Sequence, residues 1–248
     1  MVGHLSGNAD PNDSGVYRQG ARAATRSSGI NLVFYSLLLH PARIRPYGGH
    51  VSSDGVVTAP ERAEATRRPR QEETVRKLVV AALETLRESS YADLTVRGVA
   101  ARARVAPATA YTYFSSKNHL VAEVYLDLVR QVPYFTDVND TRINRVQQAL
   151  RSLALVVADE PEVAAACTTA LLSTDAGVTP VREQIGAQIH KRIKSALGPD
   201  ADTRTVSALE MSYFGALVHA GSGVLSYRQI ADRLGYVVGL ILNEDRTR

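Results

Sequence analysis

The sequence predicts an all-α protein, and three observations support this fold class. From about residue 70 onward, apolar residues recur at intervals of three and four, the spacing that places them on one face of an α-helix. These runs are bounded by residues that begin or end helices, such as Pro107, Pro161 and Gly198. The sustained alternation of apolar and polar residues that is typical of a β-strand does not occur in the sequence.

The composition is that of an ordinary globular protein with a mild excess of positive charge. The 248 residues are 45% hydrophobic and 22% charged, and the formal net charge is +4 at pH 7. This excess is compatible with a polyanionic partner but does not establish one. The single cysteine, Cys167, excludes a framework of intrachain disulfides and fits a reducing compartment. Because no apolar run approaches the roughly 20 residues that cross a bilayer, we expect a cytoplasmic protein without membrane association.

The chain divides into three parts by composition and periodicity. Residues 1–66 are rich in Gly, Ser, Asp, Asn, Arg and Pro and show no sustained period. Such a segment buries too little apolar surface to offset the entropy of ordering it, so we predict a disordered N-terminal extension. A three-helix unit is predicted over residues 67–117, and a longer helical domain over residues 118–248.

The first helix of the three-helix unit is predicted from Gln71 to Ser89. Pro69 and the acidic pair Glu72–Glu73 provide its start, since acidic side chains favour the positive end of the helix dipole. Its apolar residues form a single stripe: Val75, Leu78, Val79, Ala82, Leu83 and Leu86. This stripe is the face that we expect to pack against the other two helices of the unit.

Two short helices joined by a tight turn are predicted within residues 94–117. Thr95 stands where an N-cap hydroxyl would satisfy the first free amides of a helix. The apolar positions of this helix are Val96, Val99, Ala100 and Ala103. Arg104 and Val105 interrupt the pattern, and Pro107 then begins a second helix at a position where a missing N–H costs nothing.

The second of these short helices has one inward and one outward face. Ala110 and Phe114 face inward, and the residues left pointing outward are Thr109, Thr112 and Tyr113. A short helix that presents hydroxyl groups, flanked by Arg97 and Lys117, suits the major groove of DNA. The segment is therefore a predicted helix-turn-helix, and residues 67–117 are a predicted DNA-binding domain.

Helical patterns continue through the rest of the chain. Ser116 or Asn118 caps a helix that stops at Pro133. The further helices are predicted over Thr141–Asp159, Pro161–Leu172, Thr179–Leu197, Asp202 or Thr203 to Gly221, and Tyr227–Leu242 with Ser226 as its cap.

The three-helix unit resembles that of the TetR family of bacterial transcriptional repressors. The matching residues are Thr95, Val96, Arg97, Val99 and Ala100 before the turn, and Val105, Thr109, Tyr111, Tyr113, Phe114, Ser116, Lys117 and Leu120 after it. The resemblance covers roughly residues 70–125. Beyond them it implies an all-α domain that binds a small-molecule inducer and forms a homodimer.

The resemblance implies a set of contacts with double-stranded DNA. Arg97 falls where the family often reaches a base edge, and its planar fork suits guanine O6 and N7. The positions that approach bases in some members are Pro107, Ala108 and Tyr111, and those that usually contact the backbone are Thr109, Thr112, Tyr113 and Lys117. Thr95 completes the predicted set. Packing between helices remains an alternative for Tyr111, and a solvated surface position remains one for Tyr113 and Lys117.

Three features near this unit stay open. The turn usually holds glycine where this chain has Arg104, which must adopt a left-handed backbone or a slightly different turn. Ser or Thr is common where the chain has Ala106, which gives up a side-chain cap worth about 1 kcal/mol. The basic cluster Arg67–Arg70 is either an arm for phosphates or the minor groove, or a solvated run of charge.

The resemblance also implies a ligand cavity among the middle helices. The candidate lining residues are Tyr134, Phe135, Cys167, Thr168, Leu171, Met211, Tyr213, Phe214 and His219. Apolar walls with a few polar groups suit a largely apolar ligand. The same mixture suits an ordinary core, so both interpretations stand.

The last two helices, Thr203–Gly221 and Ser226–Leu242, are those that build the dimer interface in the family. The last helix carries an apolar stripe of Ile230, Leu234, Val237, Val238 and Ile241, with Gly235 and Gly239 allowing close approach. We expect this stripe to support a dimer, the alternative being that it packs only within its own subunit.

The prediction is a homodimeric repressor that binds a near-palindromic operator and is released by a small, largely apolar ligand. The alternatives are an all-α enzyme and a helical adaptor that binds protein rather than DNA. No phosphate-binding loop, metal-ligand spacing or nucleophile motif occurs in the sequence, so we predict no catalytic residue, metal or cofactor.

Overall fold

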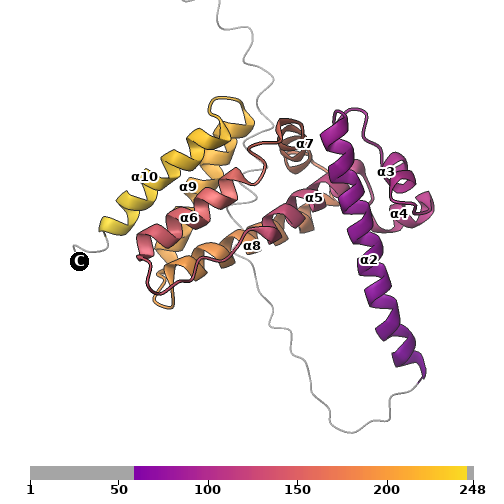
Figure 1. Cartoon of the computed structure of the whole chain (residues 1–248), viewed down its shortest axis with the longest axis horizontal. Coiled ribbons are helices and arrows are strands. Elements are labelled where there is room, and N and C mark those ends of the chain that lie inside the picture. The colour runs from indigo at the N-terminus through magenta and orange to yellow at the C-terminus, as the bar shows by residue number, and fades with distance from the viewer. Residues whose placement is uncertain (1–58, 245–248) are drawn as a thin grey trace, which may run out of the picture.

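The computed structural model describes residues 59–244, with side chains from 69 to 242, and the regular structure within that range is helical (Figure 1). The helices are α2 (Ala59–Glu88), α3 (Val96–Arg102), α4 (Pro107–Tyr113), α5 (Lys117–Gln131), α6 (Arg142–Leu155), α7 (Pro161–Leu171), α8 (Val178–Leu197), α9 (Thr203–Gly221) and α10 (Tyr227–Glu244). The all-α prediction is confirmed. Residues 1–58 of the predicted extension lie outside the described range.

The predicted start of the first helix is wrong. Helix α2 begins at Ala59 rather than Gln71, and Pro69 lies inside it. Residues 59–66 therefore belong to the helix and not to the extension. The prediction relied on an apolar period, which this segment lacks. The segment consists largely of Ala, Glu and Arg, whose helix propensity favours a helix without an apolar face. Figure 1 shows the first turns of α2 projecting beyond the other helices.

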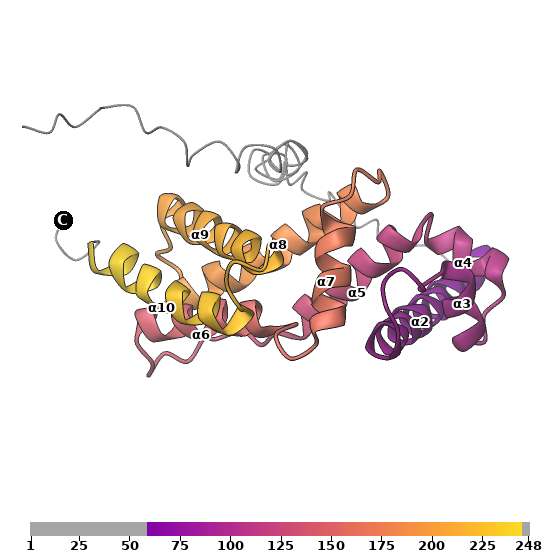
Figure 2. The same ribbon diagram turned by 90° about the horizontal axis from the view of Figure 1, so that it is seen from above.

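Helices α2, α3 and α4 form a compact unit, here called the head. Its core is made by the predicted apolar stripe of α2 and the inward residues of the two short helices. The side chains with at most 2% exposure are Leu78, Ala82, Leu86, Leu94, Val99, Ala100, Ala110 and Phe114. Figure 2 shows the head at one end of an elongated molecule.

Helix α5 joins the head to the rest of the chain, here called the body (α6–α10). It packs against α2 on the head side and against α7 and α8 on the body side. Helices α6 and α10 pack closely together, and α9 lies beside α10 (Figures 1 and 2). No helix in residues 59–244 is long and apolar enough to span a bilayer.

Side-chain caps set the starts of several helices from α5 onward. Of the two candidate caps of α5, the structure uses Ser116, whose hydroxyl accepts the N–H of His119 at 3.0 Å. Helices α6 and α9 begin in the same way at Thr141 and Asp202. Within the body, the boundary that departs most from the prediction is the end of α6, which stops at Leu155 rather than Asp159.

Candidate nucleic-acid interface

The helix-turn-helix is built from local signals that the sequence contains. The hydroxyl of Thr95 accepts the N–H of Gly98 at 3.0 Å and caps α3. Helix α4 begins at Pro107, and its N-cap residue Ala106 makes no side-chain hydrogen bond. These contacts confirm the predicted cap, the predicted first helical proline and the predicted loss of a cap at the start of α4.

Arg104 adopts the left-handed backbone in the turn between α3 and α4. Its φ is 55°, and its N–H donates to the carbonyl of Ala101 at 3.1 Å. The next N–H, of Val105, donates to the carbonyl of Ala100 at 2.9 Å. The turn thus keeps the shape that glycine adopts freely, at a cost of about 1–2 kcal/mol for a residue with a Cβ.

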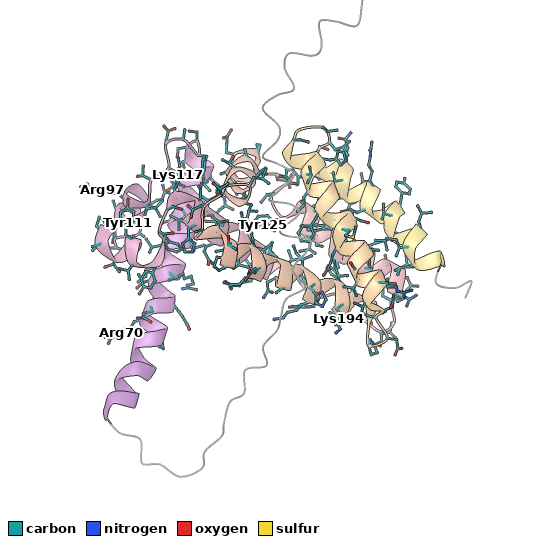
Figure 3. All side chains as sticks on the ribbon, turned by 180° about the vertical axis from the view of Figure 1, so that it is seen from behind. Arg70, Arg97, Tyr111, Lys117, Tyr125 and Lys194 are labelled. Atoms are coloured by element: carbon teal, nitrogen blue, oxygen red, sulfur yellow. The ribbon has the colours of Figure 1, made fainter. Side chains whose placement is uncertain are left out.

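Most residues predicted to contact DNA are exposed on one part of the head. The exposed members of the set are Thr95, Arg97, Pro107, Ala108, Thr109, Tyr111 and Thr112. The Tyr111 side chain is 53% exposed, so it is not a core residue between helices. Figure 3 shows Arg97 and Tyr111 at the outer side of the head, away from the body. Thr112 donates its hydroxyl to the carbonyl of Ala108 at 3.0 Å.

Tyr113 and Lys117 are partly buried rather than free on the surface. The Tyr113 side chain packs against the core of the head. The ammonium of Lys117 donates to the carbonyl of Tyr91 at 3.1 Å and lies 4.3 Å from the centroid of that ring. The hydroxyl of Tyr91 donates in turn to Asn118. Lys117 therefore helps to fix the loop before α3 onto α5, and an ammonium keeps two further N–H donors for another partner.

The arginines around α3 differ in what they contact. Arg102 binds Glu88 with two hydrogen bonds of 2.5 and 2.6 Å and Glu84 with one of 3.0 Å. The hydrogen bonds that Arg102 donates to Glu88 and then to Glu84 raise the pKa of Arg102 above its usual value. Arg102 therefore ties α3 to α2. Arg97 and Arg104 have exposed side chains without a partner in the described part of the chain.

A first contact between body and head lies directly after α4. The hydroxyl of Ser116 donates to Asp175, in the loop between α7 and α8, and the same carboxylate accepts the N–H of Gly177 at 2.8 Å. These bonds lower the pKa of Asp175. The backbone approach is close, because a Cβ at position 177 would lie 2.5 Å from Oγ of Ser115. A side chain at position 177 would therefore require the Ser115 hydroxyl to move.

A second contact lies at the other end of α7. Arg87 of α2 donates to the two carboxylate oxygens of Glu160 at 2.5 and 2.8 Å. Glu160 directly precedes α7, and Asp175 follows it. The residues that flank α7 therefore bond to Arg87 of α2 at one end and to Ser116, the N-cap of α5, at the other. Neither contact was predictable from the sequence, because neither pair has a spacing that a local pattern could reveal.

Comparisons with known proteins agree with this geometry. The family model described as "Bacterial regulatory proteins, tetR family" matches residues 78–124, which include all of α3 and α4. An uncharacterized HTH-type transcriptional regulator of Mycobacterium tuberculosis (strain ATCC 25618 / H37Rv) is 66% identical over 201 residues, which cover 77% of this chain and 94% of that relative. A relative from Mycobacterium bovis gives the same values. The chain belongs to the TetR family.

A solved structure shows the same fold. The crystal structure of a TetR transcriptional regulator from Rhodococcus sp. RHA1 is similar with a TM-score of 0.57 and 22% identity, covering 67% of this chain and 95% of that chain. As a TetR-family member, the protein is a DNA-binding transcriptional regulator of the helix-turn-helix type and not an enzyme. Family membership thus sets aside the enzyme and the helical adaptor.

Within this TetR-family protein, some predicted ligand residues meet in a largely buried polar cluster. Cys167 and Thr168 of α7 lie with Tyr213 of α9, and they are joined by Tyr125 and Tyr227, which the prediction missed. The Tyr125 and Tyr213 hydroxyls are 3.5 Å apart. Burial raises the pKa of Cys167 to about 12 and raises the pKa of each tyrosine. The cluster is therefore uncharged at neutral pH.

The remaining predicted ligand residues lie elsewhere. Tyr134 and Phe135, in the loop between α5 and α6, line a surface hollow together with Arg145 of α6. Met211 and His219 are exposed on α9, and the residues half-buried near the core are Leu171 and Phe214. The structure therefore does not bring the predicted set into one pocket. No group of residues that could hold a metal ion occurs in the described part of the chain.

The apolar face of α10 is divided between the core and solvent. The predicted stripe is mostly intramolecular, with Ile230, Leu234 and Val238 at 2% exposure or less. Gly235 likewise faces its own subunit, since its carbonyl accepts the Gln147 amide at 2.8 Å. The large exposed apolar residues on helices α9 and α10 are Met211 (57%), Tyr236 (77%) and Leu240 (68%). Ile230, Leu234 and Val238 therefore pack within their own subunit, as the alternative interpretation of the stripe expects.

Proposed function

We propose that the protein is a homodimeric repressor that binds a near-palindromic operator and releases it when a small ligand binds the body. The observation that carries the proposal is the exposed surface of α3 and α4, where Arg97 and Tyr111 project away from the body (Figure 3). An unpaired guanidinium next to a short exposed helix fits the major groove. We place this activity in the cytoplasm, where chromosomal DNA is accessible.

In the proposed complex, base contacts and phosphate contacts come from different residues. Arg97 reads guanine, and Pro107, Ala108 and Tyr111 approach base edges in the groove that α4 occupies. The residues that contact phosphates are Thr95, Thr109, Thr112, Tyr113 and Lys117. Lys117 has a double role, because one N–H holds Tyr91 while the other two are available to a phosphate.

The proposed dimer uses the exposed apolar residues of α9 and α10. Met211, Tyr236 and Leu240 are large apolar side chains that are exposed to solvent in the single chain and would be buried by a docked partner. A second copy of the chain is the occupant, because one helix-turn-helix makes few base contacts. Two copies related by a twofold axis match half-sites about 34–36 Å apart on a near-palindrome.

The proposed ligand is small, uncharged and largely apolar, with one or two polar groups. The cluster around Cys167, Thr168 and Tyr213 offers hydroxyls and a thiol but no charge, and burying an unpaired ionic group there would be costly. A ligand seated there contacts α7, which meets the head at Glu160 and at Asp175. Movement of α7 then changes how the two heads match the half-sites, provided that the ligand prefers this second state.

The test is a gel-shift titration with the DNA that flanks the gene, at stated salt, against a random-sequence duplex of equal length. Arg97→Ala should relax the preference between the two DNAs, whereas Lys117→Ala should weaken both alike and flatten the salt dependence. Lys194→Ala is the matched control, since Lys194 is exposed on α8 in the body (Figure 3). Wild-type protein that binds both DNAs equally contradicts the proposal.

A further inference from the structure

Arg104 combines a strained backbone with an exposed, unpartnered side chain. Its φ of 55° lies in the region that glycine adopts without penalty. The guanidinium is exposed and pairs with no residue of the described part of the chain. Internal packing and internal pairing therefore do not account for arginine at this position. A strained residue that is not explained by its own surroundings is a candidate for function.

The nearby Arg102 shows what an internal role looks like. Its guanidinium is held by Glu84 and Glu88, so its charge is compensated within the head. Arg97, in the first turn of α3, and Arg104, just after its last turn, carry charges with no such compensation. Uncompensated positive charge therefore lies at both ends of α3.

The position of the turn makes a phosphate the natural partner of this charge. In helix-turn-helix complexes the first helix crosses the DNA backbone and the second lies in the major groove. The turn between α3 and α4 consequently passes the edge of the groove, where phosphates line the backbone. We propose that Arg104 binds a backbone phosphate beside the groove occupied by α4. This inference rests on the proposed function, and it adds a sequence-independent contact.

The test compares Arg104→Gly with wild type. Glycine removes the charge and relieves the strained φ, so thermal unfolding should occur at the same or a higher temperature. Affinity for the flanking DNA and for a random-sequence duplex should fall by the same factor. The slope of log affinity against log salt should decrease by about one per bound subunit. Between about 50 and 200 mM salt, wild type should therefore lose roughly three- to four-fold more affinity per subunit than the variant.

Two further variants separate charge from backbone conformation. Arg104→Asn tolerates a left-handed backbone without the charge and should behave as Arg104→Gly does. Arg104→Lys keeps a cation in the strained turn and should retain the wild-type salt slope. A glycine variant that binds DNA as tightly as wild type overturns the inference. So does weaker binding with an unchanged slope, which would reflect turn geometry alone. If wild type binds neither DNA, the proposed function itself has failed.

Discussion

The hydroxyl of Ser116 donates a hydrogen bond to Asp175, and this bond joins the first turn of α5 to the loop between α7 and α8. Ser116 is also the N-cap of α5, where it accepts the N–H of His119. Phe114, which ends the recognition helix α4, lies just before it in the chain. The loop between α7 and α8 is therefore bonded directly to the junction between α4 and α5.

The contribution of Asp175 to stability should depend on pH. Its pKa is lowered in the folded protein by the Ser116 hydroxyl and the Gly177 N–H. A carboxylate with a lowered folded pKa adds stability that is complete above its unfolded value of about 3.9 and is lost as the pH falls through the folded value. Urea unfolding of Asp175→Asn at pH 7 should show a loss of about 0.5–1 kcal/mol, allowing for solvent screening. The gap to wild type should shrink near pH 3.

Asp200→Asn is the control for this experiment, because Asp200 is exposed in the loop between α8 and α9. It should unfold as wild type does at both pH values. If the difference in free energy of unfolding between wild type and Asp175→Asn stays constant with pH, the carboxylate charge does not contribute to stability.

Leu240→Glu should separate the proposed dimer into monomers. Its side chain is 68% exposed on α10, so the charge is tolerated in the monomer but is buried without a partner when a second copy docks. Sedimentation velocity at matched concentration measures the effect, and DNA affinity should fall with it. Val138→Glu changes an equally apolar residue, 88% exposed in the loop between α5 and α6, and should remain dimeric. If Leu240→Glu forms a dimer as stable as that of wild type, Leu240 does not lie in the dimer interface.

Cys167 should resist alkylation in the folded protein. Burial raises the pKa of its thiol to about 12, so its thiolate fraction at pH 8 is roughly a thousand-fold below that of a free cysteine. Iodoacetamide labelling followed by intact mass spectrometry should show slow modification in buffer and fast modification in urea. Rapid labelling of the folded protein would show that the cluster opens readily to solvent.

Short-range signals made the head predictable from sequence. Thr95 and Ser116 cap amides in the first turn of the helix that follows, and Pro107 occupies a first helical position where its missing N–H costs nothing. Each role depends only on neighbouring residues and can be predicted from the sequence. The exception is the start of α2. Residues of high helix propensity there extend the helix to Ala59 without the apolar face on which the prediction relied.

Contacts between distant segments were not predictable in the same way. Lys117 lies on Tyr91, and Ser116 meets Asp175, because of how helices pack and not because of any spacing in the chain. The same holds for the polar cluster of the body. Tyr125 on α5 and Tyr227 on α10 lie far from Cys167 in the sequence, so no spacing indicates that their hydroxyls share its environment.

The two attachments of α7 to the head have a thermodynamic consequence for the proposed switch. If ligand at the Cys167 cluster lowers operator affinity by some factor, operator must lower ligand affinity by the same factor. Arg87 and Ser116 touch neither the cluster nor, in the proposed complex, the bases. Substitutions at these two positions should therefore change the ligand concentration at which the operator is vacated. The sensitivity of the regulator would thus be adjustable in evolution without altering which ligand or which sequence it recognises.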